Sequence, residues 1–575
     1  MDAARIESTL RTLRSRLLEQ LQGDHWEGRL SSSALSTATA TIALTLAGGA
    51  EHEALAARGT QWLLGAQNDD GGWGDTDLSL SNISTTALCW AALTLRSADT
   101  QAAAAYMERH AGGLTPEALV AAIKRRYGKD HTFSVPILTV LAIAGLLGED
   151  GWKRVPQLPF ELAYFPQSWY AVLQLPVVSY ALPALIAIGQ ARHTKRPSRN
   201  PATRLFRNAV REATLDKLAS IQPPNGGFLE ATPLTSFVSM SLITAGRRDH
   251  EVVRKGLAFL VASAREDGSW PIDTNLATWV TTLGVNAFGA APLPFDEPQR
   301  LAIRDWLLAQ QFRDVHPYTG AAPGAWAWTN LPGGVPDADD TPGALLALHR
   351  LGVDARTIEA AKNGVRWLLD LQNSDGGIPT FCRGWGALPF DRSSPDLTAH
   401  TLRAWQAWSG TVGSELEARL QKAIPRAIRF LERAQRHDGA WTPLWFGNQH
   451  APEDENPTYG TARVLPALPP DSDAAKRGER WLLDAQNPDG GWGGAPGVAA
   501  SIEETALAVS ALAARPSARA AVERGLDWLV EATDEGRRTP PSPIGFYFAK
   551  LWYFEELYPL IFALEAFDAA SEASL

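Results

Sequence analysis

Cysteine is scarce in this chain: only Cys89 and Cys382 occur among its 575 residues. Two cysteines cannot form the disulfide framework of a small secreted protein, and they fit a reducing compartment. The N-terminus lacks a charged segment followed by an apolar core and a cleavage site, so we expect no secretion signal. Basic residues are not in excess, because 53 of them face 63 acidic residues, a net charge of −10. A nucleic-acid partner is therefore not expected.

Strand patterns are missing too, since no stretch shows sustained alternation of apolar and polar residues, whereas helical spacing recurs. Tryptophan is abundant, with 21 residues. Much of it lies in a repeated unit in which a glutamine precedes a glycine by four residues and a tryptophan closes the turn. The clearest copies end at Trp73, Trp441 and Trp492, and weaker ones end at Trp270 and Ile378. Each unit predicts a helix, a tight polar turn and a second helix. Such pairs close into a ring or stack, so we predict an all-α fold with these tryptophans in the scaffold.

Three carboxylates lie within four residues, at Asp337, Asp339 and Asp340, directly before an apolar helix. Thr341 is the expected N-cap of this helix and Pro342 its first residue. Crowded carboxylates favour keeping one of them protonated. The helix N-terminus favours the anion that remains once the proton has left. This combination suits difficult proton donation. Taken alone, the same residues also fit an acidic helix cap without chemistry.

No charged residue occurs between Glu161 and Arg192, and much of this stretch is strongly apolar. Pro166, Pro176 and Pro183 argue against a single continuous helix, although prolines are tolerated in membranes. A basic segment follows, with Arg192, Lys195, Arg196, Arg199, Arg204 and Arg207. We predict that this region docks on an anionic membrane surface. The alternatives are a buried interdomain helix beside a solvated loop, and a true membrane span.

These features resemble a known family. The repeats are similar to the QW motif, and residues 337–341 to the DxDD(T) motif, of squalene–hopene cyclases and their class II terpene cyclase relatives. The resemblance extends from Trp26 to Pro559. It implies two α-α barrels of the α6-α6 type, one inserted in the other, in a monotopic enzyme that starts polyene cyclisation with a protonated aspartic acid. We expect an N-terminal helix at 1–24 on the second barrel, an inserted first barrel with the membrane-docking segment at 25–250, and a second barrel with the acid motif at 251–575.

The resemblance also implies roles for individual residues. Asp339 would be the proton donor, with Asp337 and Asp340 as supporting carboxylates. His400 would hydrogen-bond the acid, and Asp396 would hold the imidazole. Asp396 and His400 share one face of a predicted helix, and a charged imidazole would make Asp339 a stronger acid. A surface contact between these two residues without chemistry is the simpler alternative.

The migrating positive charge of a cyclisation needs aromatic faces, each worth about 0.5–2 kcal/mol, and exclusion of water. The aromatic residues expected to bind the substrate by resemblance are Tyr180, Trp279, Trp328, Trp445, Phe546 and Tyr547. Several of them fit a core role equally well. Cys382 also occurs where the family has a cysteine near the acid.

The chain departs from the family at Val280, where hopene-forming enzymes have an acidic residue, and at 328–335, which lack the family's run of aromatics. These departures concern the shape of the cavity and therefore the substrate. We predict a class II terpene cyclase that protonates a terminal alkene of squalene or a related linear isoprenoid and forms a hopene-like triterpene. The alternative is a cyclase of a shorter isoprenoid or of a prenyl diphosphate. We predict no cofactor and no metal, because a carboxylic acid needs no Lewis acid and no His/Cys cluster is visible.

Two other classes of protein fit part of this pattern. A prenyltransferase β-subunit shares the helical barrel, but it needs an Asp/Cys/His zinc set and an α partner, and Cys89 and Cys382 lack the expected neighbours. A non-catalytic helical scaffold is favoured only if Asp339 is exposed. The expected partners are a linear isoprenoid, squalene first, and a membrane surface, and a homodimer is allowed. The expected location is the cytoplasmic side of the membrane, as a peripheral or monotopic protein.

Overall fold

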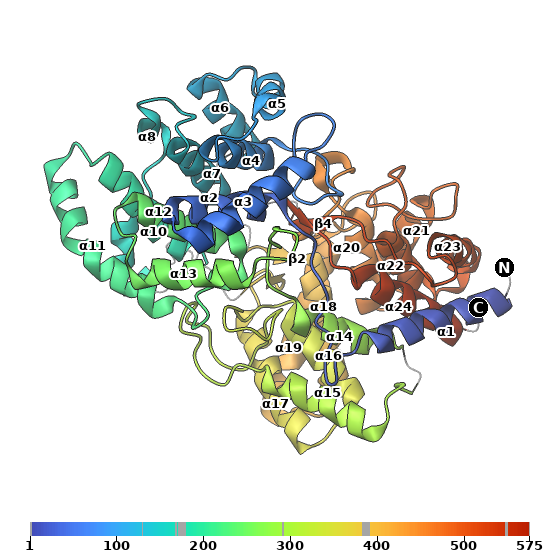
Figure 1. Ribbon diagram of the computed structural model, residues 1–575. Coiled ribbons are helices and arrows are strands. Elements are labelled where there is room, and N and C mark those ends of the chain that lie inside the picture. Colours follow the sequence, from blue (N-terminus) through green and yellow to red (C-terminus); the bar gives the residue numbers. More distant parts are fainter. Residues whose placement is uncertain are drawn as a thin grey trace. The chain divides into compact units, whose positions relative to one another are not determined.

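The computed structural model describes residues 3–128, 130–166, 169–170, 180–289, 292–381, 391–546 and 550–573. The chain divides into two compact units (Figure 1). The first unit comprises Met1–Arg29, Asn275–Asn330 and Gly334–Leu575, and the second comprises Leu30–Thr274 and Leu331–Gly333. In sequence, the second unit is thus an insertion in the first. The first unit corresponds to the predicted second barrel, which carries the acid motif, and the second unit to the predicted inserted barrel.

Six of the described helices form a closed inner ring in the first unit, because each packs against the next and the last packs against the first. They are α14 (Ala277–Ala287), α16 (Asp340–Leu351), α18 (Pro395–Trp408), α20 (Pro457–Val464), α22 (Ile502–Leu512) and α24 (Tyr558–Glu572). The outer helices against them are α15 (Glu297–Ala309), α17 (Ala355–Leu371), α19 (Ser414–Ala434), α21 (Asp473–Asp484), α23 (Arg519–Ala532) and α1 (Ala3–Glu19). This unit is an α-α barrel, as predicted.

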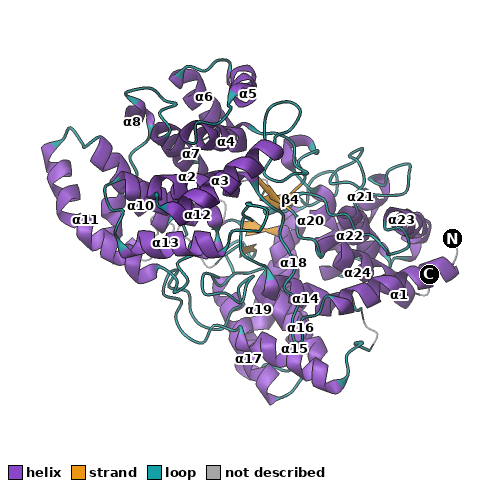
Figure 2. Cartoon of the chain, in the orientation of Figure 1, coloured by secondary structure: helices purple, strands orange, loops and turns teal. Residues whose placement is uncertain are grey.

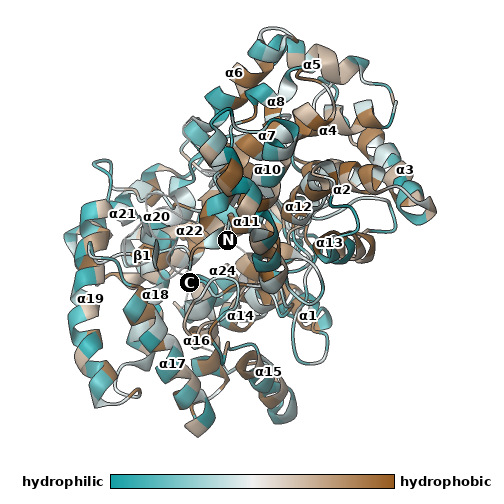
Figure 3. Cartoon of the chain, turned by 90° about the vertical axis from the view of Figure 1, so that its left-hand side faces the viewer, coloured by the Kyte–Doolittle hydropathy of each residue, from teal (hydrophilic) through white to brown (hydrophobic). Residues whose placement is uncertain are grey.

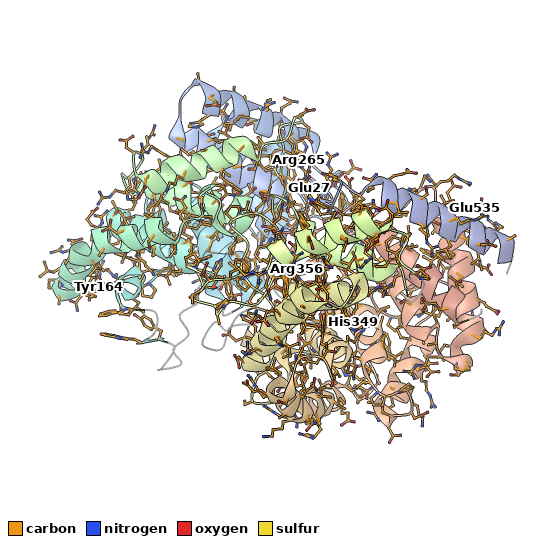
Figure 4. All side chains as sticks on the ribbon, turned by 90° about the horizontal axis from the view of Figure 1, so that it is seen from below. Glu27, Tyr164, Arg265, His349, Arg356 and Glu535 are labelled. Carbon is orange, nitrogen blue, oxygen red and sulfur yellow. The ribbon has the colours of Figure 1, made fainter. Side chains whose placement is uncertain are left out.

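The N-terminal helix α1 closes the outer layer by packing on α23 and α24. Leu13 and Leu17 are fully buried in this contact region. Ion pairs border it, since Arg14 contacts Asp568 at 2.7 Å and Arg5 contacts Glu535 at 3.2 Å (Figure 4 labels Glu535). The helix therefore belongs to the first unit.

The second unit repeats the arrangement. Its described inner helices are α2 (Ala34–Ala47), α4 (Ile83–Leu95), α7 (His131–Ile143), α10 (Leu182–Lys195) and α12 (Thr232–Thr244), and α12 packs back on α2. The outer layer contains α3 (Ala50–Gly65), α5 (Gln101–Ala111), α6 (Pro116–Tyr127), α8 (Gly151–Arg154), α11 (Pro201–Ile221) and α13 (Glu251–Ala262). Inner helices such as α2 are buried along most of their length, whereas outer helices such as α19 bury one stripe and expose a hydrophilic face (Figure 3).

The predicted boundary at residue 250 is too early. α13 packs on α12 and α2, and the second unit continues to Thr274. The reason is the repeat that ends at Trp270: its backbone N–H donates to Thr37 Oγ1 at 3.0 Å and its indole donates to the carbonyl of Leu260 at 2.7 Å. These bonds tie α13 and the following turn to α2. The other boundary falls after Arg29 rather than after residue 24.

The QW repeats share one set of hydrogen bonds. At Trp492 the indole donates to the carbonyl of Leu482 at 2.7 Å, and the backbone N–H donates to Thr505 Oγ1 at 2.9 Å. The amide of Gln486 donates to the carbonyl of Gly490 at 2.8 Å. The same bonds occur at Trp73 and Trp441, and all three indoles are fully buried. The predicted scaffold role of these tryptophans is confirmed.

Short strands supplement the helices (Figure 2). β1 (Ile378–Pro379) pairs with β2 (Ser393–Ser394), and β3 (Phe446–Gly447), β4 (Ile544–Phe546) and β5 (Leu551–Tyr553) form an antiparallel sheet. Short 3₁₀ turns are η1 (Phe160–Tyr164), η2 (Phe228–Glu230), η4 (Pro452–Asp454), η5 (Leu465–Ala467) and η6 (Pro516–Ala518). Strands of two or three residues are too short to leave an alternating pattern in the sequence. Within the described ranges, every helix falls short of the length or the apolar character that crossing a membrane requires.

Candidate active site

In each of four inner helices, a threonine fixes the helix against a backbone segment outside it. We call these residues the register threonines. The hydroxyl accepts a backbone N–H from the turn that precedes the helix on α16, α18 and α20, and from the distant segment at Trp26 on α14. The pairs are Trp26–Thr281 (2.9 Å), Trp326–Thr341 (3.1 Å), Ile378–Thr398 (2.9 Å) and Trp441–Thr461 (3.0 Å). Side chains two residues before these threonines, and two or five residues after them, line one pocket in the first unit. The lining residues are Trp279, Leu283, Asn286, Asp339, Leu346, Asp396, His400, Arg403, Tyr459, Arg463 and Glu565.

The acid motif is the first turn of α16, and its cap differs from the prediction. The carboxylate of Asp337 accepts the backbone N–H groups of Asp339 at 2.8 Å and Asp340 at 2.7 Å. Thr341 lies inside the helix instead of capping it. Its hydroxyl donates to the carbonyl of Asp337 at 2.7 Å while accepting from Trp326. The helix starts earlier because Asp337 supplies the capping oxygen.

Sequence reasoning missed Trp326 as the repeat tryptophan of this motif. Its indole donates to the carbonyl of Leu307 at 2.8 Å, and Gln311 donates to the carbonyl of Gly324 at 2.8 Å. In the clear repeats the glutamine and the glycine are four residues apart, whereas here an insertion separates them. The hydrogen bonds survive the insertion, but the sequence spacing does not.

Asp339 and His400 are in direct contact. The Oδ1 atom of Asp339 lies 3.0 Å from Nδ1 of His400, and the two side chains are 22% and 18% exposed. The ring of Trp279 meets the imidazole edge-to-face with 6.2 Å between centroids. Asp396 lines the same pocket and accepts a hydrogen bond from the hydroxyl of Ser394. The Asp339 side chain is therefore partly buried, neither fully exposed nor fully buried.

Buried carboxyl groups surround Asp339. Burial raises the pKa of Asp337 to about 7 and that of Asp396 to about 6. Burial and the neighbouring Asp337 raise the pKa of Asp340 well above its ordinary value. Loss of hydration disfavours the charged form of each group. The cluster thus retains protons at a pH where exposed carboxyl groups have lost theirs.

The expected charge on His400 is not supported. Burial lowers the pKa of its imidazole, and Arg403 and Arg463 lower it further, while the contact with Asp339 raises it. The net direction is downward, which favours the neutral ring. The sequence shows Asp396 and His400 together but not the two arginines that oppose a second positive charge.

Several pocket residues went unnoticed in the sequence. The guanidinium of Arg463 lies 5.4 Å from the ring centre of Tyr459 and 5.0 Å from that of Phe562. It also lies 3.8 Å from the carboxylate of Glu565. Aligning the inner helices on their register threonines would have found Tyr459 and Arg463, which stand two residues before and after Thr461.

Four of the predicted aromatics belong to one set of contacts in the first unit. The backbone carbonyl of Trp328 accepts from Trp279 at 3.1 Å. Phe381 then links Trp328 to Trp445, with ring centres 6.4 and 5.2 Å apart, and Trp445 meets Phe546 at 3.9 Å. Phe381 is an addition to the predicted set.

The remaining candidates are not in this set. Tyr180 is buried, at 7% exposure, in the second unit. Tyr547 and Cys382 lie outside the described residues. Val280, the position that departs from the family, is fully buried on α14.

Comparisons with known proteins agree with this architecture. Residues 275–571 match the squalene-hopene cyclase C-terminal domain, and residues 10–202 match its N-terminal domain. A squalene–hopene cyclase of Alicyclobacillus acidocaldarius is 26% identical over 60% of this chain and 72% of its own. A terpene cyclase–glycosyl transferase fusion protein of Humicola fuscoatra is 28% identical over 92% of this chain but only 46% of its own. A drimenyl diphosphate synthase of Streptantibioticus cattleyicolor is 30% identical over 51% of this chain and 53% of its own.

Among solved structures, the ent-copalyl diphosphate synthase from Streptomyces platensis matches the full length of both chains with a TM-score of 0.55 and 19% identity, a likeness of fold. The family matches place the chain in the class II terpene cyclase family. More narrowly, the chain belongs to the squalene-hopene cyclase family. It spans less than half of the Humicola fuscoatra fusion protein and 27% of the enfumafungin synthase of Hormonema carpetanum.

Proposed function

We propose that this protein protonates a terminal alkene of squalene, or of a closely related linear isoprenoid, and cyclises it to a hopene-like polycyclic product. The observation that carries the proposal is the Asp339–His400 contact inside a pocket of buried carboxyl groups. In the proposed step, the proton of Asp339 adds to the terminal alkene carbon. The alkene π electrons form that C–H bond, and the next double bond attacks the carbocation left behind. Loss of a proton, or capture of water, ends the cascade.

His400 and the buried acids support the donor in this proposal. A neutral imidazole hydrogen-bonded to Asp339 holds the carboxyl group in one orientation and adds no charge that would repel the cation. Asp337 fixes the backbone of Asp339 through its two capping bonds. Asp396, whose carboxyl retains its proton more readily than an exposed one, would hold the imidazole side of the pocket without adding a full negative charge.

The aromatic contacts of Trp279, Trp328, Trp445 and Phe546 fit stabilisation of a migrating cation, at about 0.5–2 kcal/mol for each face. We assign the same role to Tyr180 and Tyr547. An apolar, water-poor lining delays capture of the cation until the rings have closed.

A cyclase of a shorter isoprenoid or of a prenyl diphosphate is the second candidate. The likeness to a drimenyl diphosphate synthase over half the chain favours it, as do Val280 and the segment before the acids, which differ from hopene-forming enzymes. Both candidates use the same acid and differ in the length and head group of the substrate.

The test is product analysis with squalene, farnesyl diphosphate and geranylgeranyl diphosphate, using the wild type, Asp339→Asn and the exposed control Asp314→Asn. We expect the wild type and Asp314→Asn to cyclise squalene. Asp339→Asn should keep the wild-type melting temperature and form no cyclic product. Near-normal turnover by Asp339→Asn would remove this residue as the donor.

The same assay in excess chelator separates the two candidates. Acid-initiated cyclisation of a hydrocarbon needs no Lewis acid, so turnover of squalene should persist. A loss of activity that Mg²⁺ restores, together with turnover of a diphosphate, would favour the second candidate.

We also propose that the second unit docks on an anionic membrane surface. Tyr164 and Trp169 are 53% and 58% exposed, and Leu205 on α11 is 73% exposed. Phe165 joins them, 6.0 Å from Trp169 and 6.4 Å from Phe206 between ring centres. Figure 4 shows Tyr164 at the margin of this unit with its ring pointing outward. Exposed aromatic rings beside the basic N-terminal part of α11 suit the interface of an anionic bilayer.

Co-sedimentation with anionic vesicles tests this docking. Replacing Trp169, Leu205 and Phe206 by serine should release the protein, whereas Leu80→Ser, at a 53% exposed leucine of the same unit, should not. Unchanged sedimentation of the triple variant would contradict the proposal. Residues 171–179, the centre of the predicted docking segment, lie outside the described residues.

A further inference from the structure

The pocket around Asp339 contains two arginines, Arg403 and Arg463, for which the proton transfer described above has no use. Arg463 extends from α20, where Asn456 caps the helix by accepting the backbone N–H of Tyr459 at 3.0 Å. Thr461 holds the same helix to the turn at Trp441. Asn456 and Thr461 therefore hold α20 on the N-terminal side of Arg463.

The guanidinium of Arg463 is held between aromatic faces and one acid. It lies near the rings of Tyr459 and Phe562 and 3.8 Å from Glu565, whose carboxylate accepts from Ser510 at 3.4 Å. Within the described residues, its Nη2 atom is buried and has no hydrogen-bond partner. The Nη2 group is thus not used in a hydrogen bond to any described residue of the pocket that Asp339 lines.

The charged and titratable groups that share the pocket with this guanidinium come from three other inner helices and from α20 itself. They are Asp339 at the start of α16; Asp396, His400 and Arg403 on α18; Tyr459 on α20; and Glu565 on α24. Burial opposes the charge of Arg463, but Tyr459, Glu565 and Asp339 raise its pKa above the ordinary value. Arginine remains charged in such surroundings, whereas His400 is pushed toward its neutral form.

We infer that Arg463 is an electrostatic positioning residue for the proton donor: its fixed positive charge stabilises the Asp339 carboxylate that remains after proton transfer, and Glu565 tunes that charge. The inference rests on the proposed function of Asp339. An acid is stronger when its conjugate base is stabilised, and a positive charge in a pocket of low polarity does this without titrating. In this arrangement His400 orients the donor and Arg463 supplies the charge.

The decisive measurement is the pH dependence of kcat in three variants. Only a carboxyl group that carries its proton can act as the donor, so kcat should fall on the alkaline side of the profile. Arg463→Gln removes a positive charge that favours the carboxylate left after proton transfer, so the alkaline limb of the kcat profile should move upward by about one pH unit. On the acidic plateau of the profile, where the donor carries its proton, kcat should fall by about tenfold, because the weaker acid donates its proton more slowly. Arg463→Lys keeps the charge and should retain most of the activity.

Glu565→Gln gives a change of opposite sign. Removing the partly neutralising carboxylate makes the pocket more positive, so the alkaline limb should move to lower pH. Glu565 is 25% exposed and tolerates substitution better than Arg463. The matched control is Arg515→Gln, which breaks an ion pair of similar burial with Glu479 at 3.3 Å outside this pocket and should leave the limb in place.

A purely structural role of Arg463 would lower stability in both charge-removing variants without opposite displacements of the limb. If Arg463→Gln fails to fold, Glu565→Gln decides the matter alone. An active wild type whose alkaline limb moves in neither variant would overturn this inference and leave Asp339 as the donor. A wild type that cyclises no polyene would overturn the proposed function itself.

Discussion

The two barrels use the same register device and place different chemistry on it. In the second unit, Thr37, Thr86 and Thr235 accept the backbone N–H groups of Trp270, Trp73 and Phe228, each at 3.0 Å. The residues two before and two or five after these threonines are Leu35, Thr39, Ile42, Ser84, Leu88, Ala91, Pro233, Phe237 and Met240. None of these side chains is ionisable.

The equivalent positions of the first unit hold Asp339, Asp396, His400, Arg403 and Arg463. The hydrogen bonds that build a barrel are therefore independent of the side chains that point into it. Burying ionisable groups costs free energy unless they are paired or neutral. The first unit lowers this cost by keeping carboxyl groups protonated and by pairing Arg463 with Glu565, whereas the second unit places no ionisable side chain at the positions compared. The comparison separates a scaffold shared by both units from a site present in one.

The largest expected effect comes from His400 and its counterpart Leu88, each two residues after a register threonine. His400→Phe keeps the volume but removes the hydrogen bond to Asp339, so turnover should fall by about 10²–10⁴-fold. Leu88→Ala leaves a cavity and should lower the free energy of unfolding by about 2–5 kcal/mol without changing kcat per folded molecule. Turnover and melting temperature are measured on both variants. A folded His400→Phe enzyme at the wild-type rate would remove His400 from the mechanism.

Replacing the register threonines compares the two units more directly. Thr341→Val leaves the N–H of Trp326 and the carbonyl of Asp337 without their hydroxyl partner. Each loss costs about 1–3 kcal/mol, and the displaced acid turn should lower kcat by about tenfold. Thr86→Val should cost a similar stability and leave kcat unchanged. Equal kcat in both variants would show that the register bond does not position the acid.

The turn glycines should behave alike in both units. Gly490 and Gly71 have φ of +96° and +85°, and an added Cβ would lie 2.8 Å and 2.7 Å from the carbonyl oxygens of Arg524 and Ala102. Gly490→Ala and Gly71→Ala should each lower the free energy of unfolding by about 1–3 kcal/mol, because the left-handed backbone and the close contact both disfavour alanine. Chemical denaturation measures the change. A neutral substitution in one unit would break the equivalence of the repeats.

The smallest expected effect is a pH dependence of stability. Burial raises the pKa of Glu503, which is 2% exposed, to about 8. The folded state therefore keeps a proton that the unfolded chain loses near pH 4.3. This contribution to stability is complete below about pH 4 and is lost as the pH rises toward 8. Glu503→Gln should flatten the fall in melting temperature over this range, and an unchanged slope would contradict the assignment.

Much of the local structure could be predicted from the sequence. The helical class, the QW turns and the acid motif depend on residues a few positions apart, and short-range patterns determine such turns and helices. The contact of Asp339 with His400 could be expected only by resemblance, since 61 residues separate them. The predicted cap of α16 was wrong because the Asp337 carboxylate and the Thr341 hydroxyl are both possible acceptors for the N–H groups at the helix start, and their geometry, not their type, decides between them.

By itself, the sequence determined which segments are helices, where they turn, and that an acid stands at one helix start. Tertiary structure decided that Trp326 holds the acid turn, that Arg463 and Glu565 share a pocket with Asp339, and that burial lowers the pKa of His400. The physical reason is that hydrogen-bonded turns depend on neighbours in the chain. Burial and electrostatic interaction depend on neighbours in space, and these come from helices far apart in the sequence.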